Sequence, residues 1–417
     1  MENNVPKLRF PEFTGEWEKK KLGEIGETYN GLTGKSKDNF GQGKPYIQYK
    51  QIFDETKIDI SRFDYVEING SEKQNKVKFG DIFFTVSSET PEEVGMSSVL
   101  LSDVDELYLN SFCFGYRPFS LELLNPFYAR FLFRSELFRK EVILLAQGST
   151  RYNLSKVGMM KITICLPSLP EQTKIANFLS AVDDKINHLK KKKDLLEKYK
   201  KGVMQKIFSQ ELRFKDDNGV EFAEWEEKKL GEIGETYNGL TGKSKEDFGQ
   251  GKPYIQYKQI FDDTKIDISR FDYVEINGSD KQNKVEFGDI LFTVSSETPE
   301  EVGMSSVLLN NVDELYLNSF CFGYRPFSLE ILNPFYARFL FRSELFRKEV
   351  ILLAQGSTRY NLSKVGMMKI KVNLPSLPEQ TKIANFLSAI DEKINHCDRR
   401  IEKMEGWKKG LLQQMFV

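Results

Sequence analysis

The sequence predicts an α+β fold in which two mixed, mostly β domains alternate with two long helices. Shifting the chain by 208 residues superimposes the segment from Glu16 to His188 on a second copy without a gap, and about 15 of its 173 positions differ. Each copy begins with short strand-like segments and ends with a long amphipathic helical segment. A repeat this long indicates a duplicated domain rather than a solenoid.

The boundaries follow the change of pattern within each copy. We expect domains at 1–167 and 211–375 and helices at 168–210 and 376–417. Strand signals in the first domain are β-branched and aromatic runs separated by Gly, Pro and Asn, and they fall at 45–49, 80–87, 97–101 and 106–117. One helical insert is expected after Asn125-Pro126, an N-cap with proline in the first turn, and it ends at Gly148.

The long helical segments carry a stripe of apolar residues at alternating spacings of three and four. About 38 residues in each copy follow this pattern, which gives a helix of roughly 57 Å. A stripe of this kind is not stable in water on a single helix, so we expect the two helices to cover each other. Its members are Ile175, Leu179, Val182, Ile186, Leu189, Leu196, Tyr199 and Val203 in the first copy, and Ile383, Leu387, Ile390, Ile394, Cys397, Ile401, Met404 and Leu411 in the second.

The linker between the copies indicates the direction of the second helix. The polar segment 209–225 is too short to run back along the first helix. We therefore expect the second domain at the far end of that helix, an antiparallel coiled coil and pseudo-two-fold symmetry. The motif KLRF at Lys7–Phe10 resembles ELRF at Glu211–Phe214, so the amino-terminal segment is expected to take the place in one half that the linker takes in the other.

Composition excludes several classes of protein. The chain has 60 basic and 61 acidic residues, which is not the strongly basic balance of an autonomous DNA clamp. No apolar run approaches the roughly 18 residues of a membrane span, and we expect a cytoplasmic protein. The four cysteines occur singly and the two histidines, His188 and His396, have no partner pattern, so neither a metal site nor a catalytic site is expected.

Two motifs resemble functional signatures but are better explained structurally. GLTGKS at Gly31–Ser36 would need glycine at position 29 to be a phosphate-binding loop, and that residue is Tyr29. NPFY at Asn125–Tyr128 resembles an adenine methyltransferase motif, yet no glycine-rich cofactor loop follows a strand, and we interpret it as a helix cap with buried aromatics. Two nearly identical domains without a catalytic constellation favour binding over chemistry.

Three loops in each copy combine Arg or Lys with amide, hydroxyl and aromatic groups, the chemistry that proteins use on base edges and phosphates. They are 27–37, 45–51 and 147–155 and their counterparts. The predicted DNA-contacting residues are Tyr29, Asn30, Thr33, Lys35, Ser36, Gln48, Tyr49, Lys50, Gln51, Gln147, Ser149, Thr150, Arg151 and Tyr152, and Tyr237, Asn238, Thr241, Lys243, Ser244, Gln256, Tyr257, Lys258, Gln259, Gln355, Ser357, Thr358, Arg359 and Tyr360.

The whole layout resembles the specificity subunit of type I restriction-modification systems. The resemblance is strongest in LPSLPEQTKIANFLSAVDDKI and its second copy, and it extends to Glu16-Trp17, Gly80-Asp81-Ile82 and Gly148-Ser149-Thr150. It implies two target-recognition domains that each read half of a bipartite target in double-stranded DNA, helices that act as spacer and docking surface, and no active site. The expected partner contacts are Ile175, Phe178, Leu179, Ile383, Phe386 and Leu387.

The same resemblance implies the partners. Two methyltransferase (modification) subunits would modify adenine at N6 with S-adenosylmethionine, and endonuclease/translocase (restriction) subunits would use ATP and Mg. Because the two domains here are nearly identical, we expect one word read twice as an interrupted palindrome, with half-site centres about 10 bp apart. Two other hypotheses are a two-headed protein-interaction scaffold without DNA readout and a self-sufficient methyltransferase or nuclease.

Overall fold

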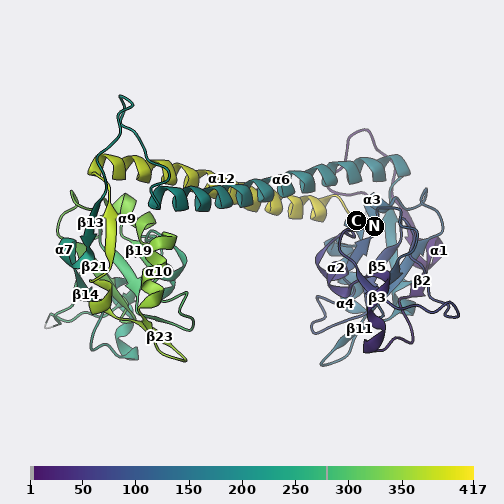
Figure 1. Cartoon of the computed structure of the whole chain (residues 1–417). Coiled ribbons are helices and arrows are strands. Elements are labelled where there is room, and N and C mark those ends of the chain that lie inside the picture. Colours follow the sequence, from purple (N-terminus) through teal and green to yellow (C-terminus); the bar gives the residue numbers. More distant parts are fainter. Residues whose placement is uncertain (1–3, 279) are drawn as a thin grey trace. The chain divides into compact units, whose positions relative to one another are not determined.

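The computed structural model describes residues 4–278 and 280–417, which form two compact units (Figure 1). Unit 1 comprises Met1–Lys190 with Arg399–Val417, and unit 2 comprises Lys191–Asp398. Both boundaries fall inside long helices, α6 (Leu169–Phe208) and α12 (Leu377–Gln414). Each unit therefore contains the first half of one long helix and the second half of the other. The predicted alternation of two mixed domains with two long helices is confirmed.

The same order of short elements precedes each long helix. In unit 1 they are β1 (Glu18–Lys21), α1 (Leu22–Ile25), β2 (Gly26–Asn30), η1 (Lys37–Asn39), β3 (Phe40–Ile47), α2 (Tyr49–Asp54), β4 (Asp64–Val66), β5 (Ile82–Thr85), β6 (Ser87–Ser88), β7 (Ser97–Val99), β8 (Tyr108–Leu109), β9 (Cys113–Pro118), α3 (Pro126–Leu132), α4 (Glu136–Leu144), β10 (Ala146–Gln147), β11 (Tyr152–Leu154), α5 (Lys156–Met159) and β12 (Thr163–Leu166).

In unit 2 the corresponding elements are β13 (Glu226–Lys229), α7 (Leu230–Ile233), β14 (Gly234–Asn238), η2 (Lys245–Asp247), β15 (Phe248–Ile255), α8 (Tyr257–Asp262), β16 (Asp272–Val274), β17 (Ile290–Thr293), β18 (Ser295–Ser296), β19 (Ser305–Val307), β20 (Tyr316–Leu317), β21 (Cys321–Pro326), α9 (Pro334–Leu340), α10 (Glu344–Leu352), β22 (Ala354–Gln355), β23 (Tyr360–Leu362), α11 (Lys364–Met367) and β24 (Lys371–Leu374).

Small sheets build each mixed domain. A four-stranded antiparallel sheet has the order β2-β9-β5-β7, and smaller sheets have the orders β4-β3-β8, β10-β11-β6 and β1-β12. The register pairs Asn30 with Phe114 and Thr85 with Cys113, so β2 and β5 end where β9 begins. Unit 2 repeats these pairings with β14, β21, β17 and β19. The loops that follow β2 and β5 therefore leave the sheet at the same end of its strands.

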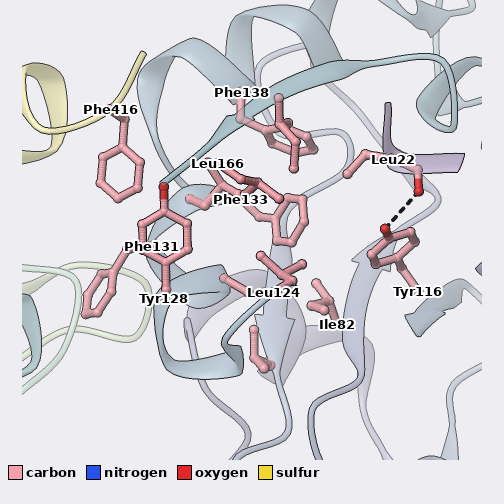
Figure 2. Packing of buried hydrophobic residues seen from close by; sticks show 14 of the residues in the cluster. Leu22, Ile82, Tyr116, Leu124, Tyr128, Phe131, Phe133, Phe138, Leu166 and Phe416 are labelled. Atoms are coloured by element: carbon pink, nitrogen blue, oxygen red, sulfur yellow. Dashed lines mark hydrogen bonds between the residues drawn. The ribbon is translucent and has the colours of Figure 1, made fainter. Parts of the chain in front are cut away.

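Aromatic side chains fill the core of unit 1 (Figure 2). The ring of Phe133 packs edge-on against Phe84 at 5.4 Å and against Phe138 at 4.8 Å between centroids. The hydroxyl of Tyr116, fully buried, donates to the Leu22 carbonyl at 2.9 Å, which satisfies its polar group. Phe416, two residues beyond α12, packs against Tyr128 at 5.5 Å. The chain end therefore belongs to this core.

The long-helix segments pair antiparallel within each unit. In unit 1, ion pairs join Asp183 to Lys408 at 2.6 Å and Lys190 to Glu405 at 2.7 Å. In unit 2, they join Lys200 to Asp391 at 2.6 Å and Lys193 to Asp398 at 2.7 Å. The numbers rise along one helix as they fall along the other, which confirms the predicted antiparallel pairing.

Most of the predicted apolar stripe is buried, with three exceptions. Tyr199 is 52% exposed, so its assignment to the buried seam is wrong, and Leu196 and Met404 are only partly buried. Lys193, the polar residue that interrupts the stripe, turns to Asp398 instead of to an apolar partner. The α12 side of the stripe therefore stays buried as far as Ile401, whereas the α6 side is interrupted at Lys193, Leu196 and Tyr199.

The amino-terminal segment and the linker make the same contacts. The Arg9 guanidinium donates to both oxygens of buried Glu171 at 2.7 Å, and Arg213 donates to Glu379 at 2.9 and 3.0 Å. In unit 1 the Leu8 amide donates to the Gln414 carbonyl at 2.9 Å. In unit 2 the Leu212 amide donates to the Lys206 carbonyl at the same distance. The predicted equivalence of KLRF and ELRF is confirmed.

Three local expectations need correction. The insert after Asn125 is not one helix, because Ser135 caps a second helix by accepting from the Phe138 amide at 3.4 Å. The strand expected at 45–49 ends at Ile47, and Tyr49 begins α2. Asn125 does cap α3 by accepting from the Phe127 amide at 2.9 Å and Tyr128 is buried, but Phe127 is 43% exposed.

Among the residues described, no helix is both long and apolar enough to cross a membrane. Within the same residues, no group of three or more His, Cys, Asp and Glu side chains is arranged to hold a metal ion.

Candidate nucleic-acid interface

A tight hairpin between β10 and β11 presents the loop at 147–152. Gly148 has φ +138, and a Cβ at this position would lie 2.1 Å from the Arg151 carbonyl oxygen, so only glycine fits the close approach of the two strands. Gln147, Ser149, Thr150 and Arg151 are exposed. In unit 2 the corresponding β22–β23 hairpin lies at the end remote from α12 (Figure 1). The hairpin displays a basic and several polar side chains to solvent.

The loop at 45–51 lies against this hairpin. The Tyr49 hydroxyl, in the first turn of α2, donates to the Ser87 carbonyl at 2.8 Å, and Ser87 on β6 pairs with Asn153 on β11. Tyr257 makes the same bond to Ser295 at 2.7 Å. Burial raises the pKa of both tyrosines, so their hydroxyls remain neutral donors. The structure thus brings together two of the three predicted loops.

The third loop reaches the same region through one residue. The Asn30 side chain, at the end of β2, accepts from the Lys156 ammonium, two residues after β11. The Thr33 amide donates to Gln74 at 3.1 Å and the Gln74 side chain returns a bond to the Thr33 carbonyl at 2.8 Å, which fixes the loop to 69–76. Asn30, Thr33 and Ser36 remain exposed. All three loops therefore leave the same edge of the mixed domain.

Several predicted contact residues have their polar groups engaged inside the domain. Gln51, 7% exposed, donates to the Arg62 carbonyl and accepts from the Asp59 amide, so its carboxamide supports a loop. The Lys35 side chain is 3% exposed and is paired with Glu72 at 2.5 Å. Gln259 and Lys243 repeat these roles in unit 2.

Tyr29 is also held inside the domain. Its hydroxyl donates to Asp81 at 2.5 Å and the Arg117 guanidinium lies 4.9 Å from its ring centre. Burial first and then the Asp81 charge raise the tyrosine pKa, and Tyr237 with Asp289 behaves alike. The prediction of DNA contact therefore rests on the exposed and half-exposed members, which are Asn30, Thr33, Ser36, Gln48, Tyr49, Lys50, Gln147, Ser149, Thr150, Arg151, Tyr152 and their counterparts.

A cleft of about 430 Å³ opens beside the hairpin of unit 2. Tyr257, Phe261, Ser295, Ser296, Glu297, Glu301, Thr358 and Arg359 line it. Arg359 donates from Nε to the Ser295 hydroxyl at 3.0 Å, and its guanidinium lies 6.0 Å from the ring centre of Phe320, which is 59% exposed. The glutamates and Phe320 are not among the residues predicted from the sequence, because they lie outside the three selected loops. Only the pairing of β18 with β23 places them beside Arg359.

The predicted partner-contact residues are mostly covered by the chain itself. Ile175, Leu179, Ile383 and Leu387 are at most 2% exposed and belong to the cores of the two units. Phe178 packs edge-on against Phe10 and Trp407, and Phe386 packs against Phe214. The prediction that the four aliphatic residues contact a partner is wrong, since the first turns of each long helix are apolar in order to join their own domain.

Duplicated mixed domains with basic, amide and hydroxyl groups at one edge, joined through paired long helices, define a two-site nucleic-acid specificity protein. Comparison with known sequences agrees. The family model described as "Type I restriction modification DNA specificity domain" matches residues 14–198 and 223–405. The chain belongs to this family of type I restriction-modification DNA specificity proteins.

Similar proteins span most or all of the chain. The putative type I restriction enzyme MjaX specificity subunit of Methanocaldococcus jannaschii is 27% identical over 444 residues, which cover 100% of this chain and 96% of that protein. The type I restriction enzyme EcoKI specificity subunit of Escherichia coli is 24% identical and covers 84% of this chain and 77% of its own length.

Solved structures have the same fold. The type I restriction-modification S subunit from M. genitalium matches with a TM-score of 0.54 at 16% identity and covers 99% of both chains. A chain from a structure titled for complex assembly and conformational transition of the type I R-M system matches with a TM-score of 0.60 at 17% identity, covering 96% of this chain and 97% of that one.

Proposed function

We propose that the two units read the same short DNA word, so that the complete target is an interrupted palindrome. The observation that carries this proposal is that every exposed position of the three loops is identical in the two copies. Two differences border the loop at 27–37. Asp38 against Glu246 keeps an exposed carboxylate, and Asn39 against Asp247 is turned to its own backbone. Asn39 accepts from the Ser36 amide at 2.9 Å and Asp247 from the Ser244 amide at 2.7 Å. The same groups thus face solvent in both units.

The inverted order of the two words is supported by the helices. Because the long-helix segments pair antiparallel within each unit, with the same ion pairs exchanged between copies, the two words are expected on opposite strands. A separation of about 10 bp between half-site centres, one helical turn, presents both words on one side of the duplex.

Catalysis on the target is assigned to partner subunits. Two modification subunits would methylate adenine at N6 with S-adenosylmethionine, and restriction subunits would use ATP and Mg, all in the cytoplasm. A net charge of −1 supports this division of labour, since a chain that neutralises few phosphates alone gains affinity from partners that also hold the duplex. Family membership favours this function over a scaffold without DNA readout.

Methylome sequencing tests the proposal. A strain that expresses the chain with its modification subunits should carry methyladenine in one interrupted palindrome, and the matched strain without the chain should not. A defined motif with two unlike half-sites would contradict identical reading. Retention of the reconstituted complex on any DNA, without preference for the motif, would instead favour the scaffold.

A further inference from the structure

Two contacts orient an arginine in the cleft beside the hairpin of unit 2. Its Nε bond to Ser295 and the nearby ring of Phe320 orient the Arg359 guanidinium, and Ser295 is itself tied to Tyr257 through its carbonyl. Arg359 forms no ion pair with any described residue, so both Nη groups of its fork remain for a ligand. A pre-oriented guanidinium loses less conformational entropy on binding than a free one.

The same cleft holds a glutamate in a fixed pose. The Ser296 hydroxyl donates to one oxygen of Glu301 at 2.9 Å, and the Ser88 hydroxyl donates to Glu93 at 2.9 Å in unit 1. Both carboxylates are nevertheless exposed to solvent. The bond recurs in both copies, so the position of this carboxylate is built into the fold. Arg151 of unit 1 is exposed and makes neither contact of Arg359, although Ser87 and Phe112 occupy the equivalent positions.

The mixture of charges selects among ligands. Two carboxylates, Glu297 and Glu301, line the cleft with Arg359, and they repel a phosphate group placed there. A base pair instead offers acceptors and donors together. Guanine presents O6 and N7 to an arginine in the major groove, and its paired cytosine presents the N4 amino group to a carboxylate.

We propose that this cleft in unit 2, and the equivalent residues of unit 1, each read a G·C base pair in their half-site. Arg359 donates both Nη groups to guanine O6 and N7, and Glu301 accepts from the N4 amino group of the paired cytosine. Arg151 and Glu93 do the same in unit 1. Phe320 and Phe112 position the arginines and do not themselves read a base. The inference rests on the proposed function, because it names one base pair of the word that both units read.

Two double variants test the assignment, in the complete complex with the modification subunits. Arg151→Ala with Arg359→Ala should relax one G·C position in each half of the methylated motif, and Glu93→Ala with Glu301→Ala should weaken preference at the same position. The matched controls are Lys140→Ala with Lys348→Ala and Glu92→Ala with Glu300→Ala, which remove the same charges outside the cleft and should leave the motif unchanged.

A second measurement uses the unaltered chain and does not depend on the folding of a variant. Oligonucleotides carry 7-deazaguanine, which lacks N7, at the assigned guanine. Binding of the wild-type complex should fall about tenfold or more, whereas the arginine double variant should lose less than about twofold on the same exchange.

The outcomes separate this inference from the proposed function. A defined motif without a G·C pair in each half overturns the inference alone. The inference also fails if a folded arginine variant methylates an unchanged motif, or if the wild-type complex binds DNA with 7-deazaguanine at the assigned position as tightly as it binds unmodified DNA. A wild-type complex that methylates no defined motif overturns the proposed function, and the inference with it.

Discussion

The two units close the end of a long helix in different ways. In unit 2, α6 runs covalently into the linker that carries Arg213, whereas in unit 1 the end of α12 meets an amino-terminal segment that carries Arg9. Both arginines nevertheless reach a buried glutamate in the first turn of the helix that belongs to their own unit. The contacts are therefore imposed by Glu171 and Glu379 and not by chain continuity.

Several differences between the copies lie on the outer strand pairs β1–β12 and β13–β24. On β1 and β12, Lys19 pairs across the strands with Cys165, and on β13 and β24 Glu227 pairs with Asn373. Glu227 also forms an exposed ion pair with Lys371 at 2.7 Å, where the first copy has Thr163. An exposed ion pair contributes little to stability. The copies also differ in the core, where Phe83 is replaced by Leu291 and both side chains are fully buried, while the three candidate loops stay the same.

The largest expected effect tests whether the two cores are equivalent. Phe133→Ala in unit 1 and Phe341→Ala in unit 2 each remove a fully buried ring and leave a cavity, at about 3–5 kcal/mol in the unfolding free energy of that unit. Denaturant unfolding, followed by a probe in each unit, measures both losses. Values that differ by more than about 1 kcal/mol would show that the near-identical cores are not energetically equivalent.

A smaller effect distinguishes the free segment from the tethered linker. Arg9→Ala leaves buried Glu171 without its charged partner, which costs about 2 kcal/mol, and the segment that precedes Trp17 then keeps only weaker contacts, such as the Leu8 amide bond to Gln414 and the packing of Phe10 on Phe178. Hydrogen exchange of residues 4–17 should therefore accelerate strongly.

Arg213→Ala provides the comparison for that experiment, because the linker is held by α6 on one side and by β13 on the other. Its hydrogen exchange should accelerate less, and Lys7→Ala, which alters an exposed residue, serves as the control. If exchange accelerates equally in the two segments, covalent attachment at both ends does not protect the linker from hydrogen exchange.

The smallest expected effect concerns Asn39 and Asp247, which differ between the copies and lie two residues beyond the loop at 27–37 and its counterpart. Exchanging the residues, Asn39→Asp with Asp247→Asn, should leave the methylated motif unchanged, because both side chains cap the backbone of the preceding serine. Methylome sequencing of the exchanged variant checks this. A motif altered in one half would place this position in contact with DNA.

Much of the architecture was predictable because its signals are local or repetitive. The heptad stripe predicts α6 and α12 to within a few residues, since 3.6-residue periodicity is set by the helix itself. Asn125 before Pro126 predicts a helix start, since the cap bond spans two residues. The break at Ser135 escaped prediction, because an apolar run hides a capping serine.

The candidate site was predictable in its loops but not in its individual side chains. Composition selected the loops that contain Arg151 and Tyr49. Gln51 and Lys35 belong to loops of the same kind, but their side chains are buried inside the domain. Their burial depends on partners such as Arg62 and Glu72, which only folding brings near. For the same reason Glu301 and Phe320 could not be assigned to the site before β18 was seen beside β23.

The sequence by itself determined that the chain is one unit written twice, with a long helix after each mixed domain and the same candidate contact loops in both. Duplication and periodicity are properties of residue order, so no coordinates are needed to detect them. Only the tertiary structure decided that the three loops share one edge, that the apolar first turns of α6 and α12 serve their own cores, and that an arginine and a glutamate line one cleft. Those facts depend on strand pairing and burial between residues far apart in the chain, and residue order does not encode them in any local pattern.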